Sequence, residues 1–230
     1  MKLKIMITTQ SDTQIGSGRG FGSVIDSDIE YDSYGLPYIP AKRIKGLFRD
    51  AALELLNFDG LNDLLEYTEK DIDEVFGIIG STNSSNSLIF DNLSIKDKKH
   101  IAPWLDYLFS NYNYQFNSNT MQSYFTSIRN QTAIDGDKGI AKDYSLRTFR
   151  VLKKGFTFEG DISINNNDKQ DKIVKMLAFI SLVIKRIGTQ RNRGFGKIEI
   201  EIINEKDEQL KVNLKNELKG KLEKELGGNL

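Results

Sequence analysis

The chain of 230 residues has no cysteine and only one histidine, His100. The absence of cysteine excludes disulfides, thiolate metal sites and cysteine nucleophiles. A single histidine cannot form a multi-histidine metal site, and it makes a Ser/His/Asp triad a poor explanation of function. His100 ends the lysine-rich run KDKKH, which predicts a surface position for it.

An excess of charge of one sign and long apolar runs are missing too. The 32 Lys and Arg residues balance 32 Asp and Glu residues, so an anionic partner would have to be bound by local basic patches. The N-terminal MKLKIMITTQ lacks the apolar run of a signal peptide. The longest apolar stretch, 176–184, is too short to span a bilayer. We therefore expect a soluble, cytoplasmic protein with no membrane partner.

Periodic patterns in the rest of the chain predict an α+β fold. Alternating apolar and polar residues predict strands at 2–8, 87–95, 156–164 and 197–203. A 3.6-residue apolar period predicts helices that begin near Ala41 and near Asp168. This order, βαββαβ, is that of a ferredoxin-like or RRM-like core, in which two helices cover one face of a four-stranded sheet.

A chain of this length is most simply one domain, and we predict a single domain over 1–230. Its core is expected at about 1–95 and 150–204. An insertion and a hairpin are expected at about 96–149, and a charged peripheral segment at 205–230. Within the insertion we predict a short helix around Trp104, a core residue, and a loop over 110–120.

Four alternating glycines, at 16, 18, 20 and 22, follow the first predicted strand. Their spacing, G-x-G-x-G-x-G, is not a dinucleotide-binding fingerprint, because the next segment is acidic and does not begin a helix, and no Walker lysine follows. The segment is then either a flexible hairpin between two strands or a loop whose backbone closely approaches a ligand.

Four acids alternate after the glycines, namely Asp26, Asp28, Glu30 and Asp32. They do not form an EF-hand, because the sixth position is Tyr31 where glycine is needed and the twelfth is Pro37 where a bidentate glutamate is needed. The acids either line a solvated strand edge or contribute to a site.

The helix that begins near Ala41 has an apolar side and a basic side. Its basic residues Lys42, Lys45 and Arg49 lie opposite the apolar ones, and Gly46 beside them leaves room for a ligand. No acid occurs in 41–49, although a solvated helix face would also be basic. A second basic, glycine-rich segment, TQRNRGFGK at 189–197, carries Arg191 and Arg193. Two such segments on one surface favour a nucleic-acid backbone over a small metabolite.

The polar segment from Arg129 to Arg150 predicts a projecting hairpin. It reads RNQTAIDGDKGIAKDYSLRTFR, with extended arms on either side of a turn signal at Gly136. Its basic residues include Arg129, Lys138 and Arg147.

Four segments together resemble the RAMP superfamily of CRISPR effector proteins, and in particular the guide-RNA-binding backbone subunits of type III complexes. They are IGSGRGFGSVID (15–26), GLPYIPAKRIKGLFRDAA (35–52), RNQTAIDGDKGIAKDYSLRTFRVLKKGFTFEGDI (129–162) and GTQRNRGFGKIEI (188–200). The resemblance implies a modified ferredoxin-like core that holds the guide RNA by its phosphates. It also implies that residues 129–147 form a thumb hairpin, which displaces one base of the guide–target duplex.

The partners that the resemblance implies are a crRNA guide, a target RNA and other CRISPR effector subunits, among them copies or paralogues of this chain in a filament used in antiviral defence. From the residues and the resemblance together, the residues expected to bind RNA are Gly18, Arg19, Gly20, Lys42, Arg43, Lys45, Gly46, Arg49, Arg129, Lys138, Arg147, Arg191 and Arg193.

The resemblance also implies a catalytic residue. Target-cleaving members have an aspartate shortly before the Pro-x-x-Pro segment, and Asp26, six residues before Asp32, matches it best. Such an aspartate would bind Mg²⁺ or another divalent cation and help to align a ribose 2′-hydroxyl for attack on the neighbouring phosphate. Asp26 is therefore the expected catalytic and metal-binding residue of an endoribonuclease.

Two alternatives stay open. AKRIKG replaces the Gly-Ser-Ser-Leu of many backbone subunits and resembles the type III-D branch, which includes non-cleaving subunits. The chain would then be a structural crRNA-binding subunit. The other alternative is a stand-alone ferredoxin-like RNA-processing endonuclease, which the near-absence of histidine disfavours, because such enzymes often use histidine as an acid or base.

Overall fold

The computed structural model describes residues 1–16, 25–58, 65, 67–78, 87–165, 168–204, 209–210 and 212–216. Its elements, in chain order, are β1 (Lys2–Thr9), α1 (Ala41–Leu56), α3 (Glu69–Phe76), β2 (Leu88–Phe90), β3 (Ser94–Ile95), α4 (Lys98–Asn111), α5 (Ser118–Phe125), β4 (Thr126–Gln131), β5 (Arg147–Leu152), β6 (Thr157–Ile164), α6 (Gln170–Val183), the 3₁₀ turn η1 (Arg191–Arg193) and β7 (Ile198–Ile203). The predicted α+β class is confirmed.

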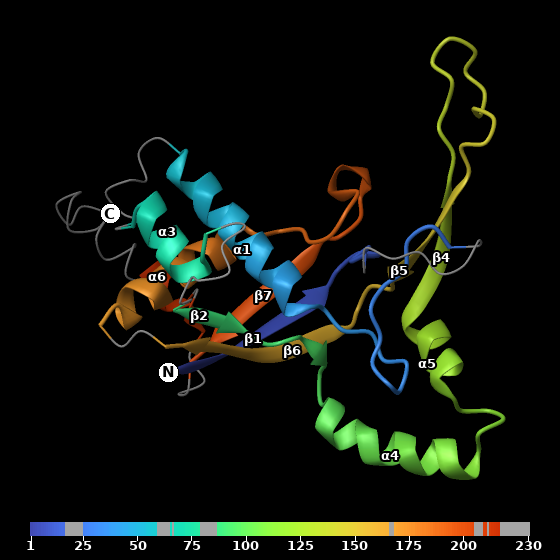
Figure 1. Ribbon diagram of the computed structural model, residues 1–230, viewed down its shortest axis with the longest axis horizontal. Coiled ribbons are helices and arrows are strands. Elements are labelled where there is room, and N and C mark those ends of the chain that lie inside the picture. The colour runs from blue at the N-terminus through green and yellow to red at the C-terminus, as the bar shows by residue number, and fades with distance from the viewer. Residues whose placement is uncertain are drawn as a thin grey trace.

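The main sheet has the order β2-β6-β1-β7, and β3 also pairs with β6. All of these pairings are antiparallel. β1 lies in the middle and buries Leu3, Ile5 and Ile7 on one face, as its alternating sequence predicts. Figure 1 shows α1, α3 and α6 gathered together against this sheet. The predicted ferredoxin-like βαββαβ core is therefore confirmed.

The second predicted strand is interrupted, and the interruption positions α1. Between β2 and β3 the chain leaves β6, and Leu93 exchanges two backbone hydrogen bonds of 2.9 Å with Ile39. Pro40, at the N-cap of α1, has no side-chain donor or acceptor, and Asn92 Oδ1 accepts instead from the Ala41 N–H at 2.8 Å. The broken strand thus fixes where the basic helix begins.

A second sheet is the hairpin of β4 and β5, which projects from the core (Figure 1). The two strands pair in register from Thr126↔Leu152 to Gln131↔Arg147. Beyond them an isolated bridge joins Ile134 and Ala141, and Asp135 closes the turn by accepting from the Gly139 N–H at 2.8 Å. The projecting hairpin predicted from the sequence is confirmed.

The insertion before the hairpin differs from the prediction. It consists of two helices, α4 and α5, and α4 begins six residues before Trp104. Trp104 was predicted to be a core residue, and this is wrong, because 69% of it is exposed. The inner side of α4 is supplied by Leu105 and Phe109, which leaves Trp104 on the outer side. Within the described residues no helix is both long and apolar enough to cross a membrane.

A charged contact joins α3 to α6. Thr68 and Asp71 form a capping box at the start of α3, and Asp71 Oδ1 lies 2.9 Å from Lys172 Nζ on α6. Burial alone would raise the pKa of Asp71, but the hydrogen bonds from Lys172 and Thr68 outweigh it and lower this pKa to about 2.

Asp71→Asn should therefore lower the free energy of unfolding by about 1–2 kcal/mol at pH 7. Because the folded-state pKa of Asp71 is depressed, this stability is present above pH 4 and is lost as the pH falls towards 2. Urea titrations at several pH values measure the difference. Glu69→Gln is the control, since it removes a first-turn charge and keeps both Asp71 contacts. Equal effects of the two variants at pH 7 would contradict the prediction.

Candidate nucleic-acid interface

The basic loop, residues 189–197, precedes β7. It lies between the end of β1 and the root of the hairpin, which is the part of β4 and β5 next to the core (Figure 1). Thr189 donates from its N–H to the carbonyl of Gln14 at 3.0 Å, and its side chain bonds Gln14 Oε1 at 2.8 Å. Gln131 on β4 donates to Gln190 at 2.6 Å and accepts from Arg193 Nη1 at 3.2 Å. Segments far apart in the sequence thus meet at one place.

The loop rests on the hairpin through an aromatic contact. The rings of Phe195 in the loop and Phe149 on β5 meet edge to face, with centroids 5.9 Å apart. Arg186 Nη1 donates to the carbonyl of Phe195 at 2.9 Å and thereby also holds this residue in place. These contacts leave Arg191 and Arg193 exposed at the outer end of the loop.

The N-terminal end of α1 approaches the same place. Lys42 and Arg43 are exposed, and Arg43 Nη2 donates to the carbonyl of Gly16 at 3.0 Å. Gly16 also forms a β-bridge with Ile29. The predicted RNA-binding residues Gly18, Arg19 and Gly20 lie in 17–24, outside the described residues.

The basic side predicted for α1 is divided in the structure. Lys45 is half-buried, and this burial lowers the pKa of its ammonium group. Gly46 is exposed, and a Cβ added there would meet nothing within 4 Å. Arg49 faces α3, where its guanidinium lies 2.6 Å from Asp73 and only 16% of its side chain is exposed. Of the four basic residues, Lys42 and Arg43 are therefore the most accessible.

Asp26 lies against the root of the hairpin. Its N–H donates to the carbonyl of Thr148 at 2.8 Å, and its Oδ2 accepts from the Thr148 N–H at 2.6 Å. Ser27 continues this pairing with β5, since it bridges Phe149 and accepts from the Arg150 N–H at 3.0 Å. Asp26 is exposed, and its Oδ2 is the carboxylate oxygen that accepts from Thr148.

The neighbouring acids have structural roles. Asp28 is only 8% exposed and lies 3.7 Å from Arg150 Nε, while Arg150 Nη1 donates to the Tyr31 hydroxyl and to Gln122, each at 3.2 Å. Burial raises the pKa of the Tyr31 phenol. This cluster joins the segment that carries Asp26 to β5 and α5. The sequence did not identify Arg150 as its centre, because no local pattern pairs residues 28 and 150.

Asp32 is engaged as well. Its Oδ1 accepts from the N–H groups of Tyr34 and Leu36, each at 2.9 Å, and its Oδ2 lies 2.6 Å from Lys98 Nζ. A solvated edge of four equivalent acids is therefore not what the structure shows. Among these four acids, Asp26 is the exposed one.

A divalent cation at Asp26 would need ligands besides the acidic side chains that the structure describes. No cluster of three or more His, Asp or Glu side chains suited to a metal ion occurs in the described part of the chain. Mg²⁺ keeps several waters and is commonly bound by one or two carboxylates together with substrate phosphates. One exposed carboxylate fits Mg²⁺ in that way, as a site that RNA would complete.

The hairpin residues predicted to bind RNA lie at different positions between its root and its tip. Arg129, near the root, forms an ion pair with Asp12 and remains half-exposed. Arg147 is exposed at the start of β5, and Lys138 is exposed at the tip, where its N–H donates to Asp135 Oδ1 at 3.3 Å. Only the root of the hairpin therefore adjoins Asp26 and the basic loop.

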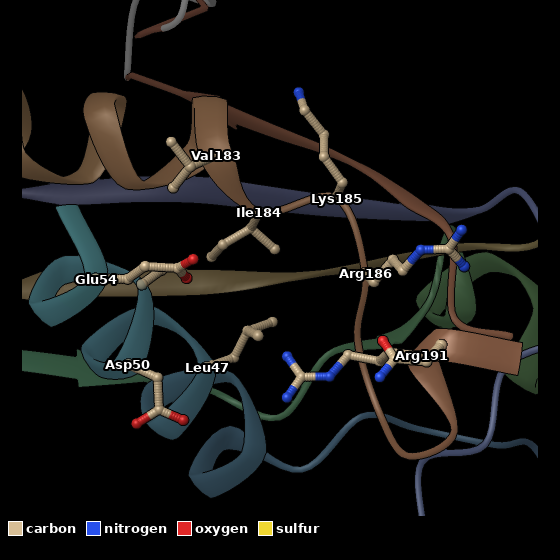
Figure 2. Close-up of a pocket in the computed structure, with 10 residues that line it drawn as sticks. Leu47, Asp50, Glu54, Val183, Ile184, Lys185, Arg186 and Arg191 are labelled. Atoms are coloured by element: carbon tan, nitrogen blue, oxygen red, sulfur yellow. The ribbon is translucent and has the colours of Figure 1, made fainter. Parts of the chain in front are cut away.

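A pocket of about 300 Å³ lies on the other side of the basic loop, between α1 and the end of α6 (Figure 2). Its floor includes Leu47 and Ile184, and the carboxylates of Asp50 and Glu54 lie on the α1 side. Arg191 extends towards α1 across this pocket, whereas Arg193 contacts the hairpin. The lining of the pocket therefore combines the two carboxylates with the cations Lys185, Arg186 and Arg191.

Comparisons with known proteins agree with this architecture. The family model of the RAMP superfamily matches residues 6–199. One similar solved chain comes from the cryo-EM structure of the Type III-B Cmr-beta bound to cognate target RNA, with a TM-score of 0.61, 13% identity, and coverage of 88% of this chain and 97% of that one. Another comes from the apo state of Type III-B Cmr-beta, with a TM-score of 0.61, 14% identity, and coverage of 89% and 98%. No curated protein matches the chain.

Proposed function

The chain belongs to the RAMP superfamily, and from this membership we propose that it is an RNA-binding subunit of a type III CRISPR effector complex. Its ligands would be a crRNA guide and a complementary target RNA, and its neighbours other effector subunits, including copies or paralogues of itself. One observation carries the proposal: Arg43, the basic loop and the hairpin root converge around the ends of segment 17–24. A similar fold occurs in the Type III-B Cmr-beta bound to cognate target RNA.

The proposed binding of the guide RNA is electrostatic. Lys42 and Arg43 would meet phosphates at the start of α1, and Arg193 would meet them beside the hairpin root. Gly46 would let the RNA backbone approach the helix closely, because no side chain occupies that space. Arg49 would act indirectly, by holding α3 against α1 through Asp73.

We further propose that the subunit cleaves the target RNA at Asp26. Thr148 holds Oδ2 of this carboxylate beside the root of the hairpin, and the residue is exposed. A bound Mg²⁺ would supply Lewis-acid stabilisation of charge on the scissile phosphate. The alternative is a structural subunit in which Asp26 is inert, and the AKRIKG form of the helix start, similar to the type III-D branch, favours it.

Lys42→Ala and Arg43→Ala should each weaken guide-RNA binding by about 1 kcal/mol or less if these residues meet phosphates. Each should also make the dependence of log K on log salt shallower by about 0.7, the value for one phosphate contact on a single strand. Filter binding at several salt concentrations measures both. Lys99→Ala is the control, since it removes an exposed lysine from a different helix, α4. Unchanged affinity and slope would show that this helix start is only a solvated face.

A further inference from the structure

The insertion carries a row of large aromatic side chains that the core does not use. The aromatic stripe consists of Trp104 and Tyr107 on α4 with Tyr112 and Tyr114 in the turn that follows, and these are 69%, 53%, 49% and 99% exposed. Trp104 and Tyr107 share one side of the helix because they are three residues apart. The rings of Tyr107 and Tyr112 meet edge to face at 6.3 Å, which makes the stripe continuous at its centre.

The opposite side of the insertion already packs against the protein. Leu105 is 5% exposed, and Phe109 contacts Tyr34 with ring centroids 6.1 Å apart. A Cβ on Gly35 would lie 2.2 Å from the carbonyl oxygen of Ser118, so α5 also lies directly on the 34–36 segment. Figure 1 shows α4 and α5 outside the main sheet, next to the hairpin root. The stripe therefore faces away from the core.

Charged residues are almost missing from the part of the chain that carries the stripe. Residues 101–128 contain a single one, Asp106, in a chain that is 28% charged. Asp106 is itself hydrogen-bonded to Tyr34. The lysines of the helix, Lys98 and Lys99, lie at its N-terminal end, before Trp104. Proteins that stack single-stranded RNA on aromatic rings combine those rings with a basic groove along the backbone, and this surface lacks one.

We infer that the aromatic stripe is a docking surface for a different protein subunit, whose contact surface is uncharged and apolar at its centre. Exposed Trp and Tyr among Asn, Ser and Gln, with charges depleted, is the composition of a protein–protein contact. The inference rests on the proposed membership of an effector complex and assigns to this insertion a partner other than RNA.

A second copy of the chain is a poorer match. Its other exposed apolar residues are scattered singly over separate elements, as Phe58, Ile78 and Ile89 are, or lie on the hairpin among charged residues. The exception is Tyr124, whose ring already packs against the rings of Phe125 and Phe156. None of these described surfaces offers a neutral apolar area to complement the stripe. A partner of another sequence is therefore the occupant that the chemistry favours.

The test is site-specific photo-crosslinking in the complete effector complex assembled with guide RNA. p-Benzoylphenylalanine is placed at position 107 or 114, and at exposed Phe58 as a control. We expect an adduct with a different protein subunit from 107 and 114 and none from 58. An adduct with RNA, an adduct with a second copy, or no adduct would each overturn the inference. The guide-RNA content of the same preparation is measured separately, so a failure of RNA binding is distinguished from a failure of docking.

A double variant tests how much the aromatic stripe contributes to the affinity for the partner subunit. Trp104→Ser with Tyr107→Ser should weaken binding of the crosslinked subunit about 30-fold or more, as loss of an aromatic interface anchor does. Because both side chains are exposed, the thermal midpoint of the isolated chain should stay unchanged. Phe58→Ser should leave the affinity as it is. Equal affinities for the double variant and the wild type would contradict the inference.

Discussion

Asp26→Asn should abolish target-RNA cleavage and leave guide-RNA binding unchanged. The substitution keeps an oxygen that can accept from the Thr148 N–H at 2.6 Å, so the hairpin root should stay in place. It removes the negative charge that a divalent cation needs. The expected loss in cleavage rate is about 100-fold or more, the size seen when one charge-stabilising group leaves an active site. Guide-RNA affinity should change by less than about twofold, since Asp26 is not a cation that meets phosphates.

The experiment uses the reconstituted complex with guide RNA, a labelled complementary RNA and Mg²⁺. Asp26→Ala is measured beside Asp26→Asn, and agreement between them would show that the charge, rather than the contact with Thr148, is what matters. Glu30→Gln is the matched control, because it neutralises a half-exposed acid on the same segment. We expect regularly spaced cuts with the wild type and with Glu30→Gln, and none with either Asp26 variant.

Each other outcome identifies one of the alternatives. Cleavage by neither the wild type nor the variants would mean that the chain is a structural subunit. Cleavage that persists in Asp26→Asn would place the catalytic group elsewhere. Cleavage of a precursor guide RNA by the isolated chain would favour a stand-alone processing enzyme.

Helices and strands with a regular pattern of buried residues could be predicted from the sequence. β1 and β7 alternate, and both bury every second residue. The apolar side of α1, from Ile44 to Leu55, is buried as its 3.6-residue period predicts. The hairpin was also predictable, because a turn such as Asp-Gly-Asp-Lys-Gly permits few backbone paths. In these cases the local pattern and the tertiary environment agree.

The insertion was not predictable in the same way. The short helix predicted around Trp104 is α4, which runs from Lys98 to Asn111 with Pro103 inside it. Trp104 suggested a core residue because large aromatic side chains are usually buried in a monomer. Which side of α4 is buried depends on partners such as Tyr34, which reaches Phe109 from a distant part of the chain. Contacts of this kind do not produce a regular apolar pattern in the sequence.

The candidate site was predicted in outline only. The two basic segments were visible because they lack acids, and the structure places Arg43 and Arg193 near the root of the hairpin. The pairing of Arg49 with Asp73, and of Arg150 with Asp28, could not be read from the sequence, since each joins residues on different elements. Charge pattern alone does not tell a cation that binds a ligand from one that binds a neighbouring acid.

Gly188→Ala should strongly destabilise the protein through the basic loop. Gly188 has a φ of +85°, and an added Cβ would lie 2.1 Å from the carbonyl oxygen of Gln14. That carbonyl accepts from the Thr189 N–H at 3.0 Å, so the clash falls on the contact that holds the loop to the end of β1. We expect a loss of about 3 kcal/mol or more in the free energy of unfolding, from left-handed strain together with displacement of backbone.

Gly194→Ala separates these two causes. Gly194 lies in the same loop with a nearly identical φ of +84°, but a Cβ there would meet nothing within 4 Å. Its substitution should cost about 1 kcal/mol, the backbone strain alone. Urea unfolding measures both variants, and equal losses would contradict the close approach to Gln14. If the loop holds RNA, Gly188→Ala should also weaken guide-RNA binding more than Gly194→Ala, because only the first moves Arg191 and Arg193 away from the hairpin root.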